Sequence, residues 1–303
     1  ENGLQTNPVG WGGAGSASGI LQMVIACAVN FNIPPSANYP ALYISPRGAA
    51  VMATVTGNIT STNPAGISSI CAGDGVGNVG TCSFGANDWT VVGGNGLQVG
   101  TAVNQHGILT FSTGVLSITG NVNVASVTSA IQFGSGGHTV TGSWTNSTTS
   151  AVNWDAGTGT VTFDAGVNST MTFAGGNLAE NEFNNVTFAS SAAGSQTFTM
   201  ATRGLRFGGT LTVADGTSTT ELATANFAID NFSSGTLVVG NGGILTANAS
   251  TVFVGNLTMT GGTSGVITIT TGVWQLGSVG LSTWNTSGAG STFTQGTGIV
   301  TIA

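Results

Sequence analysis

Apolar and polar residues alternate along most of this chain. Within the short strands of the segment from Gly142 to Phe188, valine, methionine or phenylalanine recurs at every second position with threonine between, as in Val161, Thr162 and Phe163. A period of two places the apolar side chains on one face of a strand and the polar ones on the other. Glycine, asparagine, aspartate and serine separate these runs, which is typical of turns. The pattern predicts many short, half-buried β-strands.

Similar strand and turn motifs return far along the chain. The run WTNS at 144–147 is echoed by WNTS at 284–287, and GTGTVTF at 157–163 recurs as GTGIVTI at 296–302. No helical stretch is present to connect parallel strands, so the candidates are a solenoid, whose coils are themselves the connections, and an antiparallel sandwich. Internal repetition favours an all-β, parallel β-solenoid over residues 108–303, with roughly 20–25 residues in each coil. The side chains expected to point inward are Val161, Phe163, Phe198, Met200, Leu211, Val213, Ile267 and Ile269; those expected in outward ladders are Thr162, Thr199, Thr212 and Thr268.

Composition divides the chain into two regions. All six prolines and all three cysteines lie in the first 82 residues, whereas threonine is concentrated after residue 107. We therefore expect a small N-terminal β-rich unit with a Gly-rich leader at residues 1–107, followed by the solenoid at residues 108–303. Cys71 and Cys82 enclose a turn-rich segment and are expected to form a disulfide. Cys27 would then be buried as a small apolar residue or paired in another way.

The two ends of the chain are candidate contacts between subunits. Residues 20–33 read as one long strand that ends at Pro34 and has six residues on one face: Met23, Ile25, Cys27, Val29, Phe31 and Ile33. This strand is expected either to lie in the core of a β-sandwich or to be donated to a neighbouring subunit. At the other end, Ile299, Val300, Thr301 and Ile302 would form an open coil edge. Such an edge needs a cover, from a longer chain or from another copy.

Charged residues make up only 4% of the chain, with no lysine and a net charge of −7. This balance disfavours nucleic acid as a partner. The mean hydropathy of +0.32 and the alternating pattern exclude a disordered chain. A surface of hydroxyls and amides favours self-association or glycans as partners. No apolar run is long enough to span a membrane. The chain begins without methionine or an apolar leader, so we expect that an export signal was removed or omitted.

Few residues suggest chemistry. The acids Asp155, Asp164, Glu180 and Glu182 are expected to be solvated, with Arg203 and Arg206 in surface ion pairs with Glu180 or Glu182. His106 and His138 are expected at the surface, and the tryptophans in packing. No catalytic, metal or cofactor motif is evident, so no enzyme activity and no cofactor are predicted. Eight N-x-S/T sequons, about the number that chance predicts, mark candidate glycosylation sites at Asn58, Asn146, Asn168, Asn185, Asn231, Asn248, Asn256 and Asn285.

The motifs GSWTN, AGTGTVTF, FNNVTF and GTLTV resemble the Thr/Gly/Asn-rich repeats of large secreted prokaryotic surface proteins, the β-solenoid adhesins and surface fibres. The resemblance covers residues 108–303. It implies an extracellular, structural or adhesive protein without catalytic residues. We therefore expect a subunit that assembles head to tail with copies of itself into an extracellular filament or surface fibre. The alternatives are a monomeric or cell-anchored adhesin that binds carbohydrate and, more remotely, a β-helical enzyme that acts on polysaccharides.

Overall fold

A computed structural model describes most of the chain: residues 22–48, 51–73, 78–101, 105–173, 178–191, 194–214, 218–231, 234–260, 265–277, 283–286 and 290–302. These residues form parallel strands stacked as a β-solenoid of about ten turns, with one short 3-10 helix at Leu178–Asn181. The chain divides into two compact units. Unit 1 comprises residues 1–138 and 147–155, and unit 2 comprises residues 139–146 and 156–303. The predicted fold class is confirmed.

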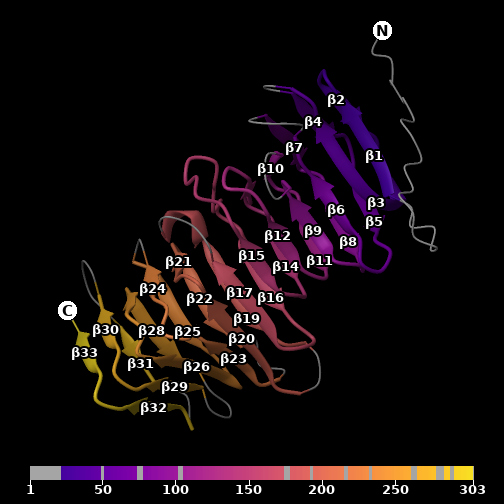
Figure 1. Ribbon diagram of the computed structural model, residues 1–303. Coiled ribbons are helices and arrows are strands. Elements are labelled where there is room, and N and C mark those ends of the chain that lie inside the picture. Colours follow the sequence, from indigo (N-terminus) through magenta and orange to yellow (C-terminus); the bar gives the residue numbers. More distant parts are fainter. Residues whose placement is uncertain are drawn as a thin grey trace. The chain divides into compact units, whose positions relative to one another are not determined.

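Unit 1 is built from three faces of parallel strands (Figure 1). The first face contains β1 (Gln22–Cys27), part of β3 (Ser36–Pro46), β6 (Ser68–Cys71), β9 (Gly96–Val99) and β12 (Val122–Val124). The second contains the start of β3, β5 (Ile59–Thr62), β8 (Trp89–Val92) and β11 (Leu116–Thr119). The third contains β2 (Phe31–Ile33), β4 (Met52–Val55), β7 (Val79–Gly85), β10 (His106–Phe111) and β13 (Ala130–Gln132).

Unit 2 has three faces of the same kind, and β14 (Gly137–Val140) carries residues of both units. The first face contains β15 (Trp144–Asn146), β17 (Ser169–Phe173), β20 (Gln196–Ala201), β23 (Thr220–Ala223), β26 (Gly243–Asn248), β29 (Val266–Ile269) and β32 (Thr292–Gln295). The second contains β16 (Thr160–Asp164), β19 (Asn185–Ala189), β22 (Thr210–Val213), β25 (Thr236–Val239), β28 (Asn256–Met259) and β31 (Trp284–Asn285). The third contains β18 (Glu182–Phe183), β21 (Leu205–Phe207), β24 (Ile229–Asn231), β27 (Val252–Val254), β30 (Val273–Leu276) and β33 (Ile299–Ile302).

The core of each unit is made of columns of inward side chains, one from each turn. In unit 2, Phe163 pairs in register with Phe188 on the next turn, and their rings stack with centroids 5.3 Å apart. Thr162 and Thr187 lie side by side on the outward side of the same strands. The predicted orientation is confirmed, because all eight residues expected inward are buried, and Thr162, Thr199, Thr212 and Thr268 are half-buried or exposed.

The long-range sequence repeat does not correspond to a structural repeat. Trp144 lies on β15 of the first face, whereas Trp284 lies on β31 of the second, and the matching runs at 157–163 and 296–302 likewise end in strands of different faces. The structural repeat is a single turn. Its length varies between 20 and 27 residues along the column Val161, Val186, Leu211, Leu237, Leu257 and Trp284. A short alternating strand fits any of the three faces, so similar sequences occupy different ones.

The prediction of one long N-terminal strand is wrong. Residues 28–30 separate β1 from β2, because each turn must pass a corner between two faces. Strand β1 pairs in parallel with β3, and β2 pairs with β4 of the third face. The β-sandwich interpretation of this region is therefore also wrong. The composition border predicted at residue 107 lies within unit 1, and the parallel pairing of β7 with β10 continues across it.

Candidate functional site

In the last described turn of unit 2, inward apolar side chains are exposed to solvent, whereas their register partners in the preceding turn are buried. Leu276 on β30 is 1% exposed, whereas Ile302, its register partner on β33, is 58% exposed although it occupies the same inward column. Likewise Phe293 on β32 is only half-buried, while its partner Ile267 is fully buried. Each turn of a solenoid is covered by its neighbouring turns. Among the described residues, no further turn covers the outer side of β32 and β33.

The four residues predicted to form an open edge divide between the two sides of β33. Val300 and Ile302 continue the inward columns of Trp274 and Leu276. Ile299 and Thr301 point outward, and Ile299 is 61% exposed. Of these four residues, only Val300 and Ile302 therefore belong to the inward columns.

The first described turn of unit 1 also exposes apolar side chains. Met23 on β1 is 39% exposed although it stands in register with the fully buried Leu42. Ile25 is half-buried beside the fully buried Ile44.

The remaining residues of the predicted donor strand are dispersed around a corner. Val29 is exposed at the corner between β1 and β2, Phe31 is half-buried and Ile33 is fully buried, while the side chain of Cys27 lies outside the described part of the structure. The six residues therefore do not share one face, and their strands pair with β3 and β4 of the same chain.

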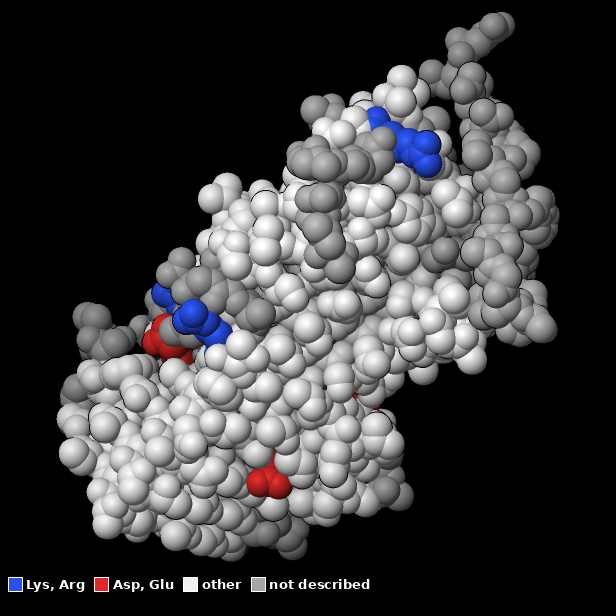
Figure 2. All heavy atoms as spheres, in the orientation of Figure 1, with Lys and Arg blue, Asp and Glu red and all other residues white. Residues whose placement is uncertain are grey.

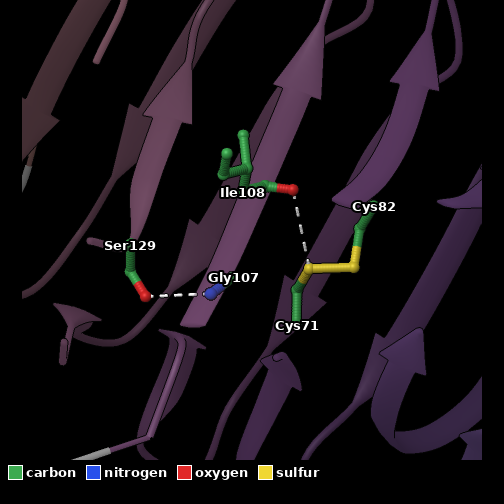
Figure 3. Close-up of a disulfide and its surroundings, with 5 residues drawn as sticks. All are labelled: Cys71, Cys82, Gly107, Ile108 and Ser129. Carbon is green, nitrogen blue, oxygen red and sulfur yellow. Dashed lines mark hydrogen bonds between the residues drawn. A yellow bond between two sulfur atoms is a disulfide. The ribbon is translucent and has the colours of Figure 1, made fainter. Parts of the chain in front are cut away.

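A disulfide joins Cys71 on β6 to Cys82 on β7, the pairing that the sequence predicted (Figure 3). Both cysteines are fully buried, and their Cα atoms lie 6.4 Å apart. The bridge connects the first and third faces within unit 1. The Sγ atom of Cys71 lies 3.9 Å from the carbonyl oxygen of Ile108, and the neighbouring Gly107 N–H donates to Ser129 Oγ at 2.9 Å (Figure 3). The disulfide is thus built into the packed interior.

Charged side chains are sparse on the visible surface, as Figure 2 shows. One charged row crosses the third face of unit 2, where Arg206 on β21 lies between Glu182 on β18 and Asp230 on β24, at 3.3 Å from each. Of the predicted pairs, Arg206 with Glu182 is confirmed; Arg203 is exposed, and the side chain of Glu180 lies outside the described residues. Sequence reasoning missed Asp230. The signal was the spacing, because 182, 206 and 230 are separated by one turn of 24 residues each.

The prediction of a surface position for His138 is wrong. The ring is 1% exposed and lies between Phe111 and Phe133, with centroids 5.3 and 5.2 Å away. Its Nδ1 accepts the Leu116 N–H at 3.0 Å, and its Nε2 donates to the Phe133 carbonyl at 2.7 Å. Burial lowers the pKa of His138, because a buried imidazolium loses its hydration, and the bond to Phe133 opposes this only in part. His138 is therefore a neutral core residue.

The other candidate groups do not form a reaction centre within the described residues. His106 is half-buried, and its Nδ1 hydrogen-bonds to Ser126 Oγ. Asp155 is exposed, and Asp164 accepts the Ser191 N–H at 2.7 Å. In the part of the chain that the structure describes, no three His, Cys, Asp or Glu side chains gather where a metal ion would bind.

Most of the described tryptophans lie in the core, as predicted. Trp89, Trp144, Trp154 and Trp274 are buried and present no ring to a sugar, while Trp284 is half-buried against Phe293. The described residues contain no helix that is long and apolar enough to cross a membrane.

The structure separates the eight sequons by accessibility. Asn146 is fully buried and donates to Asn181 Oδ1 at 3.1 Å. Asn248 is half-buried at a left-handed φ of 50°. The Nδ2 group of four others donates to a nearby acceptor: Asn58 to Asp88, Asn185 to Gly159, Asn231 to Phe207 and Asn256 to Ser234. Asn168 and Asn285 are exposed.

No family model, curated protein or solved structure shows a significant match to the chain.

Proposed function

We propose that the chain is a structural subunit of an extracellular filament or surface fibre, and that copies join end to end by continuing one solenoid. The observation that carries this proposal is the exposed inward column of the last described turn, where Ile302 is 58% exposed beside Leu276 at 1%. A further parallel turn would bury this column and occupy the backbone edge of the strand. An open strand edge with apolar neighbours favours such pairing.

Burial of apolar surface favours covering the last described turn with a further turn of the same fold. Full burial of one large aliphatic or aromatic side chain contributes about 1.5–3 kcal/mol. Phe293, Val300 and Ile302 are all incompletely buried in this turn. Such a contact would therefore gain apolar burial at several side chains at once, in addition to the hydrogen bonds of the paired strands.

The first described turn is the surface that we assign as its partner. Met23 and Ile25 are incompletely buried there, in columns that are fully buried one strand later. The described turn-to-turn pairings run in parallel, so the first turn of one copy can follow the last turn of another without reversal. A head-to-tail contact of this kind uses two different surfaces and generates an open filament unless its rotation closes a ring.

Two further features support an extracellular structural role. The buried Cys71–Cys82 disulfide is typical of proteins that fold in an oxidising compartment. The outward threonine ladders and the low charge content leave little electrostatic repulsion between copies.

Substitutions on β33 test this proposal. Ile302→Asp places a charge in the inward column, whereas the control Thr301→Asp places the same charge at the adjacent, outward position. We expect wild type and T301D to form filaments in negative-stain microscopy and sedimentation, and I302D to remain dispersed, because burying an unpaired carboxylate is costly. Equal assembly of the two variants, or a wild type that stays monomeric, would contradict the proposal. So would an intact mass showing that the native polypeptide extends beyond these residues and covers the turn itself.

A further inference from the structure

We propose that Asn168 carries an N-linked glycan on the folded protein, and that Asn146, which lies in a tripeptide of the same kind, does not. This inference rests on the extracellular location in the proposed function. It goes further in selecting one attachment site from sequons that sequence alone does not distinguish.

The side-chain amide of Asn168 is held by a hydrogen bond and is accessible to solvent. The residue lies in the turn between β16 and β17, is exposed, and follows Val167, which is 67% exposed. Its Oδ1 accepts the N–H of Thr197 from the next turn at 2.9 Å, which fixes the orientation of the amide group. Its Nδ2 donates to no acceptor among the described residues. The nitrogen that would receive the sugar is therefore held at the surface without having to give up a hydrogen bond.

The other two residues of the sequon, Ser169 and Thr170, differ in exposure. Ser169 is buried and its hydroxyl donates to the Val167 carbonyl at 3.2 Å, whereas Thr170 is exposed. Asn168 directly precedes β17 and Thr170 lies on that strand, and both residues are exposed. Asn168 and the Thr170 hydroxyl, the two groups that define the sequon, are therefore presented together to solvent.

Six of the other seven sequons lack one of these features. The Nδ2 of Asn146 is buried in a hydrogen bond to Asn181, so a sugar there would displace core packing. At Asn248 the hydroxyl residue of the sequon, Ser250, is fully buried and hydrogen-bonded to Thr224. At Asn58, Asn185, Asn231 and Asn256 the Nδ2 is already a donor. Asn285 is exposed, and its hydroxyl residue, Ser287, lies outside the described part.

The modification is a group transfer from a lipid-linked oligosaccharide pyrophosphate. The Asn168 Nδ2 forms a bond to C1 of the first sugar, and the bond from that C1 to the pyrophosphate oxygen breaks. The lipid pyrophosphate leaves with the electron pair, and one amide proton passes to a base of the transferase. No oxidation or reduction is involved.

The location is compatible with filament growth. Strand β17, which begins at Ser169, is paired on both sides, with β15 and with β20, so the glycan would project from within the stack and leave the last turn open. A hydrated glycan beside the exposed Val167 would also add steric separation to a flank with few charges.

Glycopeptide mass spectrometry tests the site on protein from its native source and on variants from an N-glycosylating host. We expect a glycan on the Asn168 peptide of wild type, retained in Thr170→Ser and Asn146→Gln and lost in Thr170→Ala, since serine preserves the sequon hydroxyl and alanine removes it. An unmodified Asn168 in native protein, or a glycan on Asn146, would overturn the inference.

Microscopy of the same samples distinguishes this failure from failure of the proposed function. Filaments with an unmodified Asn168 would overturn the glycan site alone. A glycan on Asn168 in a protein that never assembles would support the glycan site and overturn the filament.

Discussion

Truncation of Phe163 tests whether the alternating pattern sets the core of unit 2. The side chain is fully buried, stacks on Phe188 at 5.3 Å, and meets Trp144 and Phe183 edge to face at 5.7 and 6.0 Å. Phe163→Ala removes all three ring contacts and leaves a cavity. Such truncations cost about 3–5 kcal/mol, a large part of the 5–15 kcal/mol that is typical of the stability of a whole domain.

The matched control is Thr162→Ala on the same strand. Thr162 is half-buried on the outward side, next to Thr187, so its truncation is expected to change the unfolding free energy by about 0.5 kcal/mol or less. Urea unfolding followed by tryptophan fluorescence measures both variants, because Trp144 belongs to the same cluster. Similar losses for the two variants, or a larger loss for T162A, would refute the assignment of the two sides.

Two further predictions concern unit 1. Because burial lowers the pKa of His138, the unfolded chain takes up a proton near pH 6.5 while the folded chain does not. The contribution of His138 is therefore complete above about pH 6.5 and is lost as the pH falls below it. The urea midpoint should drop between pH 7 and pH 5.5, with a smaller drop in His138→Gln, and an equal drop in both would count against this cause. Removal of the disulfide in the double variant Cys71→Ala and Cys82→Ala should cost about 3 kcal/mol by the chain-entropy estimate for a loop of this length. An unchanged thermal midpoint in that variant would show that the bridge contributes nothing.

The sequence predicted whether a side chain points inward or outward better than it predicted which of the three faces a strand belongs to. Alternation assigned Phe163 inward and Thr162 outward, because the orientation of neighbouring side chains is a local property of a strand. The same rule applied to Gly137–Val140 would have placed His138 inward, on the side of the buried Val140. The surface assignment instead followed the neighbouring glycines.

Corners and turn lengths could not be predicted in this way. The alternation of residues 20–33 continues through the bend at 28–30, because a corner is decided by packing against the next turn, which is distant in sequence. Varying turn lengths also hid the true repeat, so Trp144 and Trp284 suggested an equivalence that the fold does not have. The solenoid was predicted correctly, but the long-range repetition that favoured it over an antiparallel sandwich does not correspond to equivalent positions in the fold. The burial contrast between Ile302 and Leu276 required the structure, because it depends on which strands lie in register.

Electron cryomicroscopy of the assembled protein tests the central claim most directly. We expect filaments in which strands about 4.8 Å apart continue without interruption across each subunit boundary, with the inward column of Ile302 covered by the first turn of the next copy. Single particles at every concentration, or fibres joined through their flanks with Ile302 still exposed to solvent, would contradict it.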